Sequence, residues 1–168
     1  MLLAPKVTKE IAKTRGISMG KDCISPAKHK EFSNPNQLID FVKKLRKLSG
    51  NKPVGIKMCV GHPWELVSIV KTMFLRKEYV DFITIDGAEG GTGAAPAEFT
   101  DHLGSPLKDA IVFVDNALVG SNLRERVKIG VSGKIVSAFD IAHMCSLGAD
   151  WINMARPFMF SIGCIQCR

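Results

Sequence analysis

Residues 79–96 read YVDFITIDGAEGGTGAAP, an apolar, β-branched run that leads directly into a glycine-rich segment. The run over 81–85 is typical of a buried strand, and four glycines fall within the seven residues 87–93 that follow it. Glycine loses more backbone entropy on folding than other residues, so such a cluster indicates a close approach by a ligand or another backbone. Because α/β proteins bind ligands at the carboxyl ends of their strands, this segment predicts an active-site loop.

Three more strand–helix units are predicted around this one. Strands are expected over 54–58, 127–131 and 151–155, and helices over 34–49, from 63 onward, over 106–123 and over 137–148. Apolar strands that alternate with helices favour a parallel sheet covered by helices. A Rossmann-type fold would need G-x-G-x-x-G after its first strand, whereas these glycines follow a middle strand.

The pattern therefore predicts a (β/α) barrel, but only part of one. A complete barrel has eight strands and about 250 residues. Four clear units in 168 residues predict the C-terminal half of a barrel, with residues 1–168 forming one partial domain truncated at both ends. The two open edges of a half-sheet lead us to expect association with a complementary half or with a second copy.

Composition and charge narrow the class of protein. The chain is 46% hydrophobic, and it has no apolar run near the roughly 20 residues of a membrane span, so a cytoplasmic protein is expected. The net charge is +7, but the cations of the predicted helix 34–49 lie opposite its apolar stripe of Leu38, Phe41, Val42, Leu45 and Leu48. This pattern is typical of a solvated helix face and does not favour nucleic-acid binding.

Charged residues near the strand ends are candidates for ligand binding. Lys57 lies within an otherwise apolar strand, where it either reaches solvent from an edge or points a cation into the barrel mouth. Ser132, Gly133 and Lys134 follow the strand 127–131, and a strand-to-helix turn of this kind can bind an anion through its backbone N–H groups. Ala155 and Arg156 follow the last predicted strand and would complete such a phosphate site.

Taken together, these segments resemble the FMN-binding domain of glutamate synthase, and in particular the short stand-alone glutamate synthase-like proteins. The resemblance covers essentially the whole chain. It rests on five stretches that occur in the expected order, which are DCISP at 22–26, PVGIK at 53–57, the loop 87–96, SGK at 132–134 and GCI at 163–165.

The resemblance implies an aldolase-type barrel that binds FMN and a three-iron (3Fe-4S) iron–sulfur cluster. It implies an oxidoreductase that reduces 2-iminoglutarate, formed from 2-oxoglutarate and ammonia, to L-glutamate. Ferredoxin, NADPH or an NADPH-oxidising subunit would supply the electrons. By position, the resemblance makes Lys57 and Glu89 catalytic candidates and Cys164 a cluster ligand. The residues implied to bind FMN are Gly90, Gly91, Thr92, Gly93, Ser132, Gly133, Lys134, Ala155 and Arg156.

Two departures from the family pattern leave alternatives open. The phosphate loop of the family has two adjacent glycines after an aspartate, whereas Ser132 and Lys134 flank a single glycine here. Cys167 is not at the spacing expected of a second cluster cysteine, so the cluster is expected to be incomplete in this chain. The alternatives are another FMN- or phosphate-binding barrel oxidoreductase and an inactive half-barrel that serves as a folding or partner module.

Overall fold

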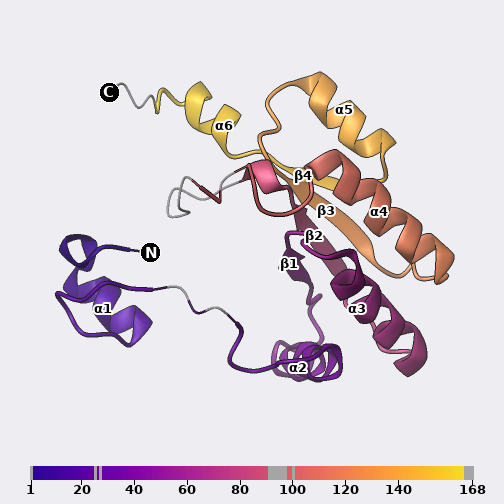
Figure 1. Ribbon diagram of the computed structural model, residues 1–168, viewed down its shortest axis with the longest axis horizontal. Coiled ribbons are helices and arrows are strands. Elements are labelled where there is room, and N and C mark those ends of the chain that lie inside the picture. Colours follow the sequence, from indigo (N-terminus) through magenta and orange to yellow (C-terminus); the bar gives the residue numbers. More distant parts are fainter. Residues whose placement is uncertain (1, 25, 27, 91–97, 100, 165–168) are drawn as a thin grey trace.

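The computed structural model describes residues 2–24, 26, 28–90, 98–99 and 101–164. Its centre is a four-stranded parallel sheet with the order β1-β2-β3-β4 (Figure 1). The strands are β1 (Ile56–Met58), β2 (Phe82–Asp86), β3 (Lys128–Ser132) and β4 (Trp151–Asn153).

Helices connect each strand to the next. The crossover helices are α3 (Pro63–Arg76), α4 (Leu107–Gly120) and α5 (Ala138–Ser146), and α2 (Pro35–Leu48) precedes β1. In Figure 1 the three crossover helices lie on one side of the sheet. Strands in sequential order with their helices on one face form half of a (β/α) barrel, as the sequence predicts, whereas a doubly wound sheet has helices on both faces.

Shorter elements flank the sheet. They are the 3-10 helices η1 (Ala4–Lys6) and η2 (Ala88–Gly90) and the helices α1 (Lys9–Arg15) and α6 (Arg156–Ser161). The two ends of the N-terminal segment 2–23 contact each other. Leu2 and Cys23 form an antiparallel bridge, and the Ala4 N–H donates to Asp22 Oδ1 at 2.7 Å. Among the described residues, no helix is long and apolar enough to cross a membrane.

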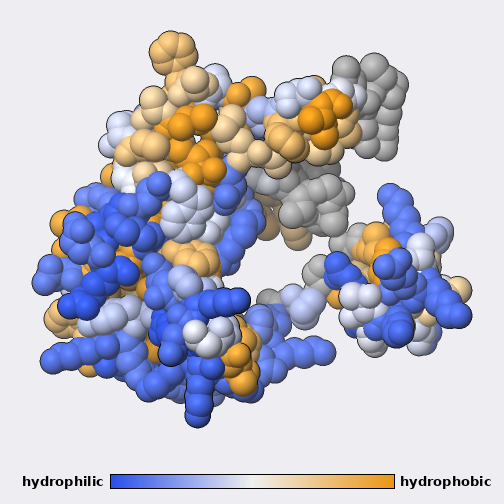
Figure 2. Space-filling model, turned by 180° about the vertical axis from the view of Figure 1, so that it is seen from behind, coloured by the Kyte–Doolittle hydropathy of each residue, from blue (hydrophilic) through white to orange (hydrophobic). Residues whose placement is uncertain are grey.

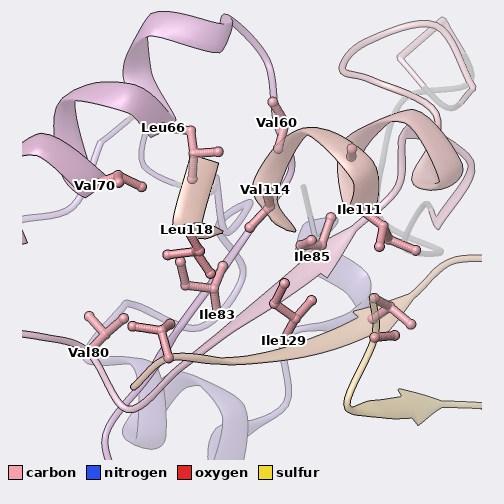
Figure 3. Close-up of a cluster of buried hydrophobic side chains, with 14 of the residues drawn as sticks. Val60, Leu66, Val70, Val80, Ile83, Ile85, Ile111, Val114, Leu118 and Ile129 are labelled. Atoms are coloured by element: carbon pink, nitrogen blue, oxygen red, sulfur yellow. The ribbon is translucent and has the colours of Figure 1, made fainter. Parts of the chain in front are cut away.

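The hydrophobic core lies between the sheet and its helices (Figure 3). Ile83 and Ile85 alternate with Phe82 and Thr84 along β2, so the two isoleucines point toward the helices and are fully buried. Side chains from α3, α4 and β3 surround them, including Leu66, Val114, Leu118 and Ile129. This core fixes the strands, and therefore the positions of the loops that follow them.

The exposure of α2 differs from the prediction at three residues, Ile39, Leu48 and Arg46. Ile39 is buried, while Leu48, predicted on the apolar stripe, is 73% exposed because the helix ends there. Arg46 does not lie on a solvated face, since it donates to Asp81 Oδ2 at 2.8 and 3.2 Å. Figure 2 shows hydrophilic side chains over α2, whereas exposed apolar side chains gather on α6 and just after it, where Phe158, Phe160 and Ile162 lie.

A capping box begins α5, at the start of the helix predicted over 137–148. The Asp140 N–H donates to Ser137 Oγ at 3.1 Å, and the Ser137 N–H donates to Asp140 Oδ2 at 2.8 Å. Hydrogen bonds from the Ser137 backbone, then from its hydroxyl and the Val136 N–H, lower the pKa of Asp140 below its usual 3.8.

We expect the variant Ser137→Ala to lose about 1 kcal/mol of unfolding free energy, because a helix N-cap is removed. Asp140→Asn should be destabilising at neutral pH and progressively less so in acid. A carboxyl group whose pKa is lowered by folding stabilises the fold above its ordinary pKa, and this contribution is lost as the pH falls through the lowered value. Thermal melts of both variants across the acid range test this, and a pH-independent effect of Asp140→Asn would contradict it.

Candidate active site

A cavity of about 320 Å³ opens at the carboxyl edge of the sheet. It brings together seven of the residues that the sequence singles out, which are Lys57, Gly90, Ser132, Gly133, Lys134, Ala155 and Arg156. These residues come from β1, from η2 after β2, from β3 and its turn, and from the segment after β4. The turns at the strand ends therefore share one cavity.

The strand register explains why these loops converge. Asp86 pairs with Ser132 across β2 and β3, and Ser132 pairs with Asn153 across β3 and β4. The last residues of three strands thus form one row at the carboxyl edge. Asn153 also lines the cavity, and the family resemblance places it with Ala155 and Arg156 in the partner loop of the phosphate site. Asp86 and Ile135 line the cavity as well, and the sequence did not single out either of them as a site residue.

Lys57, Asp86 and Ser132 form a connected polar group across three strands. The Lys57 ammonium forms an ion pair with Asp86 Oδ2, and the Ser132 hydroxyl donates to Asp86 Oδ1 at 2.9 Å. Lys57 lines the cavity and its side chain is 58% exposed, whereas that of Asp86 is 21% exposed.

The turn after β3 has a backbone that suits glycine. Gly133 has φ +144° and Lys134 has φ +45°, so both have the positive φ angles that glycine adopts more readily than other residues. Lys134 Nζ donates to both carboxylate oxygens of Asp101, at 2.6 and 2.8 Å. This contact ties the turn after β3 to the segment that follows β2.

Arg156 begins α6 and is exposed at the cavity rim. In the described part of the chain, no carboxylate lies within ion-pair distance of it. Among the described residues, the cavity lining holds three cations, Lys57, Lys134 and Arg156, and one carboxylate, that of Asp86. Lys57 and Lys134 each form an ion pair, with Asp86 and Asp101, and Arg156 supplies a further positive charge that suits an anionic ligand.

Glu89 lies beside this cavity rather than in its lining. Its two carboxylate oxygens accept the backbone N–H of Leu107 at 3.0 and 3.1 Å, at the first residue of α4. A carboxylate at a helix N-terminus satisfies a free N–H group and is favoured by the helix dipole. The contact spans 18 residues of chain, and the sequence alone did not indicate it.

Four other predicted site residues are not among the described residues that line the cavity: three glycine-loop residues and the predicted cluster cysteine. Gly91, Thr92 and Gly93 lie outside the described residues. Cys164 is an exposed free thiol just after α6. Nowhere in residues 2–90 and 98–164, as far as they are described, do three His, Cys, Asp or Glu side chains gather as metal ligands.

Cys59 is a further group at this edge, directly after β1. Partial burial raises the pKa of its thiol, and the nearby Asp86 and Glu89 carboxylates add to the effect. The thiol is therefore held protonated, and its nucleophilicity is low at neutral pH.

A larger hollow of about 800 Å³ lies between α2 and the segment before it, and its lining includes Lys28, His29, Phe32 and Phe41. It is remote from the carboxyl ends of the strands, where barrel enzymes place their chemistry. We therefore assign the candidate site to the smaller cavity.

Comparison with protein families gives a match over the whole chain. Residues 1–168 match the family model described as a conserved region in glutamate synthase.

Relatives match almost all of this chain. The glutamate synthase large subunit-like protein YerD of Bacillus subtilis is 47% identical over 96% of this chain and 30% of its own length. The archaeal glutamate synthase [NADPH] of Methanocaldococcus jannaschii is 36% identical over 96% of this chain and 31% of its own length. This chain thus spans about 30% of the length of these two relatives.

Among solved structures, a flavocytochrome b2 double mutant with sulfite bound is similar in fold. It has a TM-score of 0.50 and 16% sequence identity, over 93% of this chain and 33% of the solved chain. A likeness at this identity concerns the fold alone, and it agrees with a half-barrel that matches part of a larger chain.

Proposed function

Because this chain belongs to the glutamate synthase family, we propose that its carboxyl-edge cavity is part of the FMN and substrate site of a glutamate synthase-type oxidoreductase. The proposed reaction is the reduction of 2-iminoglutarate, formed from 2-oxoglutarate and ammonia, to L-glutamate. The observation that carries the proposal is that Lys57 on β1 and the segments that follow β2, β3 and β4 line one cavity, whose described lining includes three cations.

The donor set of the cavity fits the phosphate of FMN. Lys134 and Arg156 supply two cations, and the turn at Gly133 presents backbone to the same space. Charge-assisted hydrogen bonds from such groups are the strong ones in phosphate recognition. We assign Ser132, Gly133, Lys134, Ala155 and Arg156 to the phosphate end of the site.

Lys57 fits the other end of the site. It lies on β1, away from the turn after β3, and its ammonium reaches the cavity lining. A cation there can hold a substrate carboxylate and stabilise negative charge beside it. When bound, FMN would supply the hydride-transfer chemistry. We retain Glu89 as a residue that shapes this site, through its hold on the N-terminus of α4.

The described residues do not fit an iron–sulfur cluster. Clusters are held by several thiolates, and Cys164 is the one described cysteine that follows α6. We therefore derive no step through a cluster. The electron donor is proposed only as a class, since the relatives include a glutamate synthase [NADPH] and a ferredoxin-dependent glutamate synthase of Arabidopsis thaliana that is 29% identical.

Binding of FMN and of riboflavin to the 168-residue chain tests the proposal, with flavin fluorescence as the measurement. We expect Arg156→Ala to weaken FMN binding about tenfold, because a charge-assisted hydrogen bond to phosphate is lost. Riboflavin binding should hardly change, since riboflavin has no phosphate. Lys134→Ala should act in the same direction.

The matched control is Lys52→Ala, which removes an exposed cation at the opposite, amino end of β1. This control should leave FMN affinity unchanged. Absence of FMN binding to the unmodified chain, or equal losses for FMN and riboflavin, would refute the assignment.

A second candidate is a half-barrel that acts by association. In the described part of the chain, β1 and β4 each pair with a neighbour on one side only. Open parallel edges favour a complementary half or a second copy. A folded, associating chain that binds no FMN would favour this reading.

A further inference from the structure

Asp86 has a position in the site that the proposed function does not use. It is the last residue of β2, and it supplies the one carboxylate among the described residues that line the cavity. Its neighbours on either side are a cation on β1 and a hydroxyl on β3. Asp86 therefore joins three strands at the edge where ligands would bind.

The position of the Asp86 carboxylate is closely constrained. Its Oδ1 accepts from the Ser132 hydroxyl at 2.9 Å, while Oδ2 takes the ion pair with Lys57. On a third side is Gly90, where an added Cβ would lie 2.1 Å from Asp86 Oδ1. A side chain at position 90 would thus displace this carboxylate, so the backbone leaves space that Asp86 fills.

A carboxylate in this position changes which ligand Lys57 can hold. An incoming carboxylate alone must compete with Asp86 for the Lys57 ammonium, and it is repelled by Asp86 at the same time. A ligand with a protonated nitrogen next to its carboxylate avoids this conflict, because the nitrogen donates to Asp86 while the carboxylate faces Lys57. An α-amino acid and a protonated α-imino acid have this arrangement, whereas an α-keto acid does not.

We propose that Asp86 is a positioning and specificity residue that holds Lys57 at the carboxyl edge and selects α-amino or α-imino acid head groups over α-keto acids. The specificity half of this inference rests on the proposed function and deepens it, since the group to be reduced would be an imine. The positioning half stands on the contacts alone.

The positioning half is tested by the reactivity of Lys57 toward an acylating reagent, followed by peptide mass mapping. In Asp86→Asn, we expect Lys57 to react roughly threefold faster, since a partly exposed ion pair is lost. The exposed Lys52 is the internal reference in each sample. Ser132→Ala should give a smaller increase, and it serves as a second variant if Asp86→Asn melts early. Unchanged Lys57 reactivity in both variants would overturn the positioning role.

The specificity half is tested by titrating the 168-residue chain with L-glutamate and with 2-oxoglutarate. Asp86→Asn should weaken L-glutamate binding about tenfold, as a charged hydrogen bond is lost, and tighten 2-oxoglutarate binding. The matched control is Glu125→Gln, the same charge change on an exposed residue before β3, at the amino edge of the sheet. It should leave both affinities unchanged.

The outcomes separate this inference from the proposed function. If the role of Asp86 were merely structural, Asp86→Asn would weaken the binding of L-glutamate and of 2-oxoglutarate equally. This result would overturn the specificity role, and so would the binding of neither ligand to the unmodified chain. If FMN fails to bind while the ligand preference inverts as expected, the flavin assignment fails and the role of Asp86 stands. If FMN binds and Asp86→Asn changes neither preference nor Lys57 reactivity, this inference alone fails.

Discussion

Replacement of Ile83 by alanine is expected to lower the free energy of unfolding by about 3 kcal/mol, because large-to-small changes in a packed core leave a cavity. Ile83 lies in the centre of β2, has 0% exposure, and packs in the cluster shared by the sheet, α3 and α4 (Figure 3). For a chain of this size, the melting temperature should fall by roughly 6–12 °C.

A matched control for Ile83→Ala is available in the same chain. Ile162 is 62% exposed, just after α6, so Ile162→Ala removes the same atoms from the surface and should change the melting temperature little. Thermal and urea unfolding measure both variants. Equal effects at the two positions would contradict a core that is centred on the sheet.

Gly130→Ala is expected to disturb both the fold and the candidate site. An added Cβ at Gly130 would lie 2.3 Å from Trp151 Cε2 and 2.6 Å from Trp151 Nε1. The indole has little room to retreat, since Phe82 packs against it edge-on with ring centroids 5.4 Å apart. Overpacking of this kind costs about 2 kcal/mol.

The effect of Gly130→Ala on the site follows from the position of Trp151, the first residue of β4. A shift of β4 moves Asn153 and the segment of Ala155 and Arg156 that lines the cavity. We expect FMN affinity to fall about tenfold, as one charged contact is lost. Gly120→Ala is the control, because nothing lies within 4 Å of its added Cβ. Unchanged FMN affinity in Gly130→Ala would show that β4 does not position the site.

Local signals in the sequence predict most of the fold. Ser137 with Asp140 marks the start of α5, and Asn34 before Pro35 marks that of α2, where Asn34 Oδ1 accepts the Gln37 N–H at 3.0 Å. His62 precedes Pro63, which favours a capping role for it, but at the N-cap of α3 its side chain makes no capping hydrogen bond and its ring stacks on that of Trp64, with centroids 4.3 Å apart. The short helices α1 and α6 were not predicted, since seven and six residues carry little periodicity.

The sequence predicted only part of the candidate site, because some of its residues meet through contacts between distant parts of the chain. Glycine clusters and stray cations are visible in the sequence, and they led to Lys57, Lys134 and Arg156. Asp86 was missed because it looks like the first residue of a loop. Its partners lie 29 and 46 residues away, and only the register between strands brings them together. Long-range contacts of this kind leave no local pattern.

The order of the strands also bears on how the chain acquires its structure. Each described strand of the sheet pairs with the one that precedes or follows it in the chain, and one crossover α-helix lies between each pair, with the short η2 as well between β2 and β3. Contacts between chain neighbours close with modest loss of loop entropy, and chains begin to fold from the N-terminus during synthesis. We expect a nascent polypeptide leaving the ribosome to add one strand and one helix at a time to a growing sheet, with β4 and its part of the cavity wall docking after β1, β2 and β3.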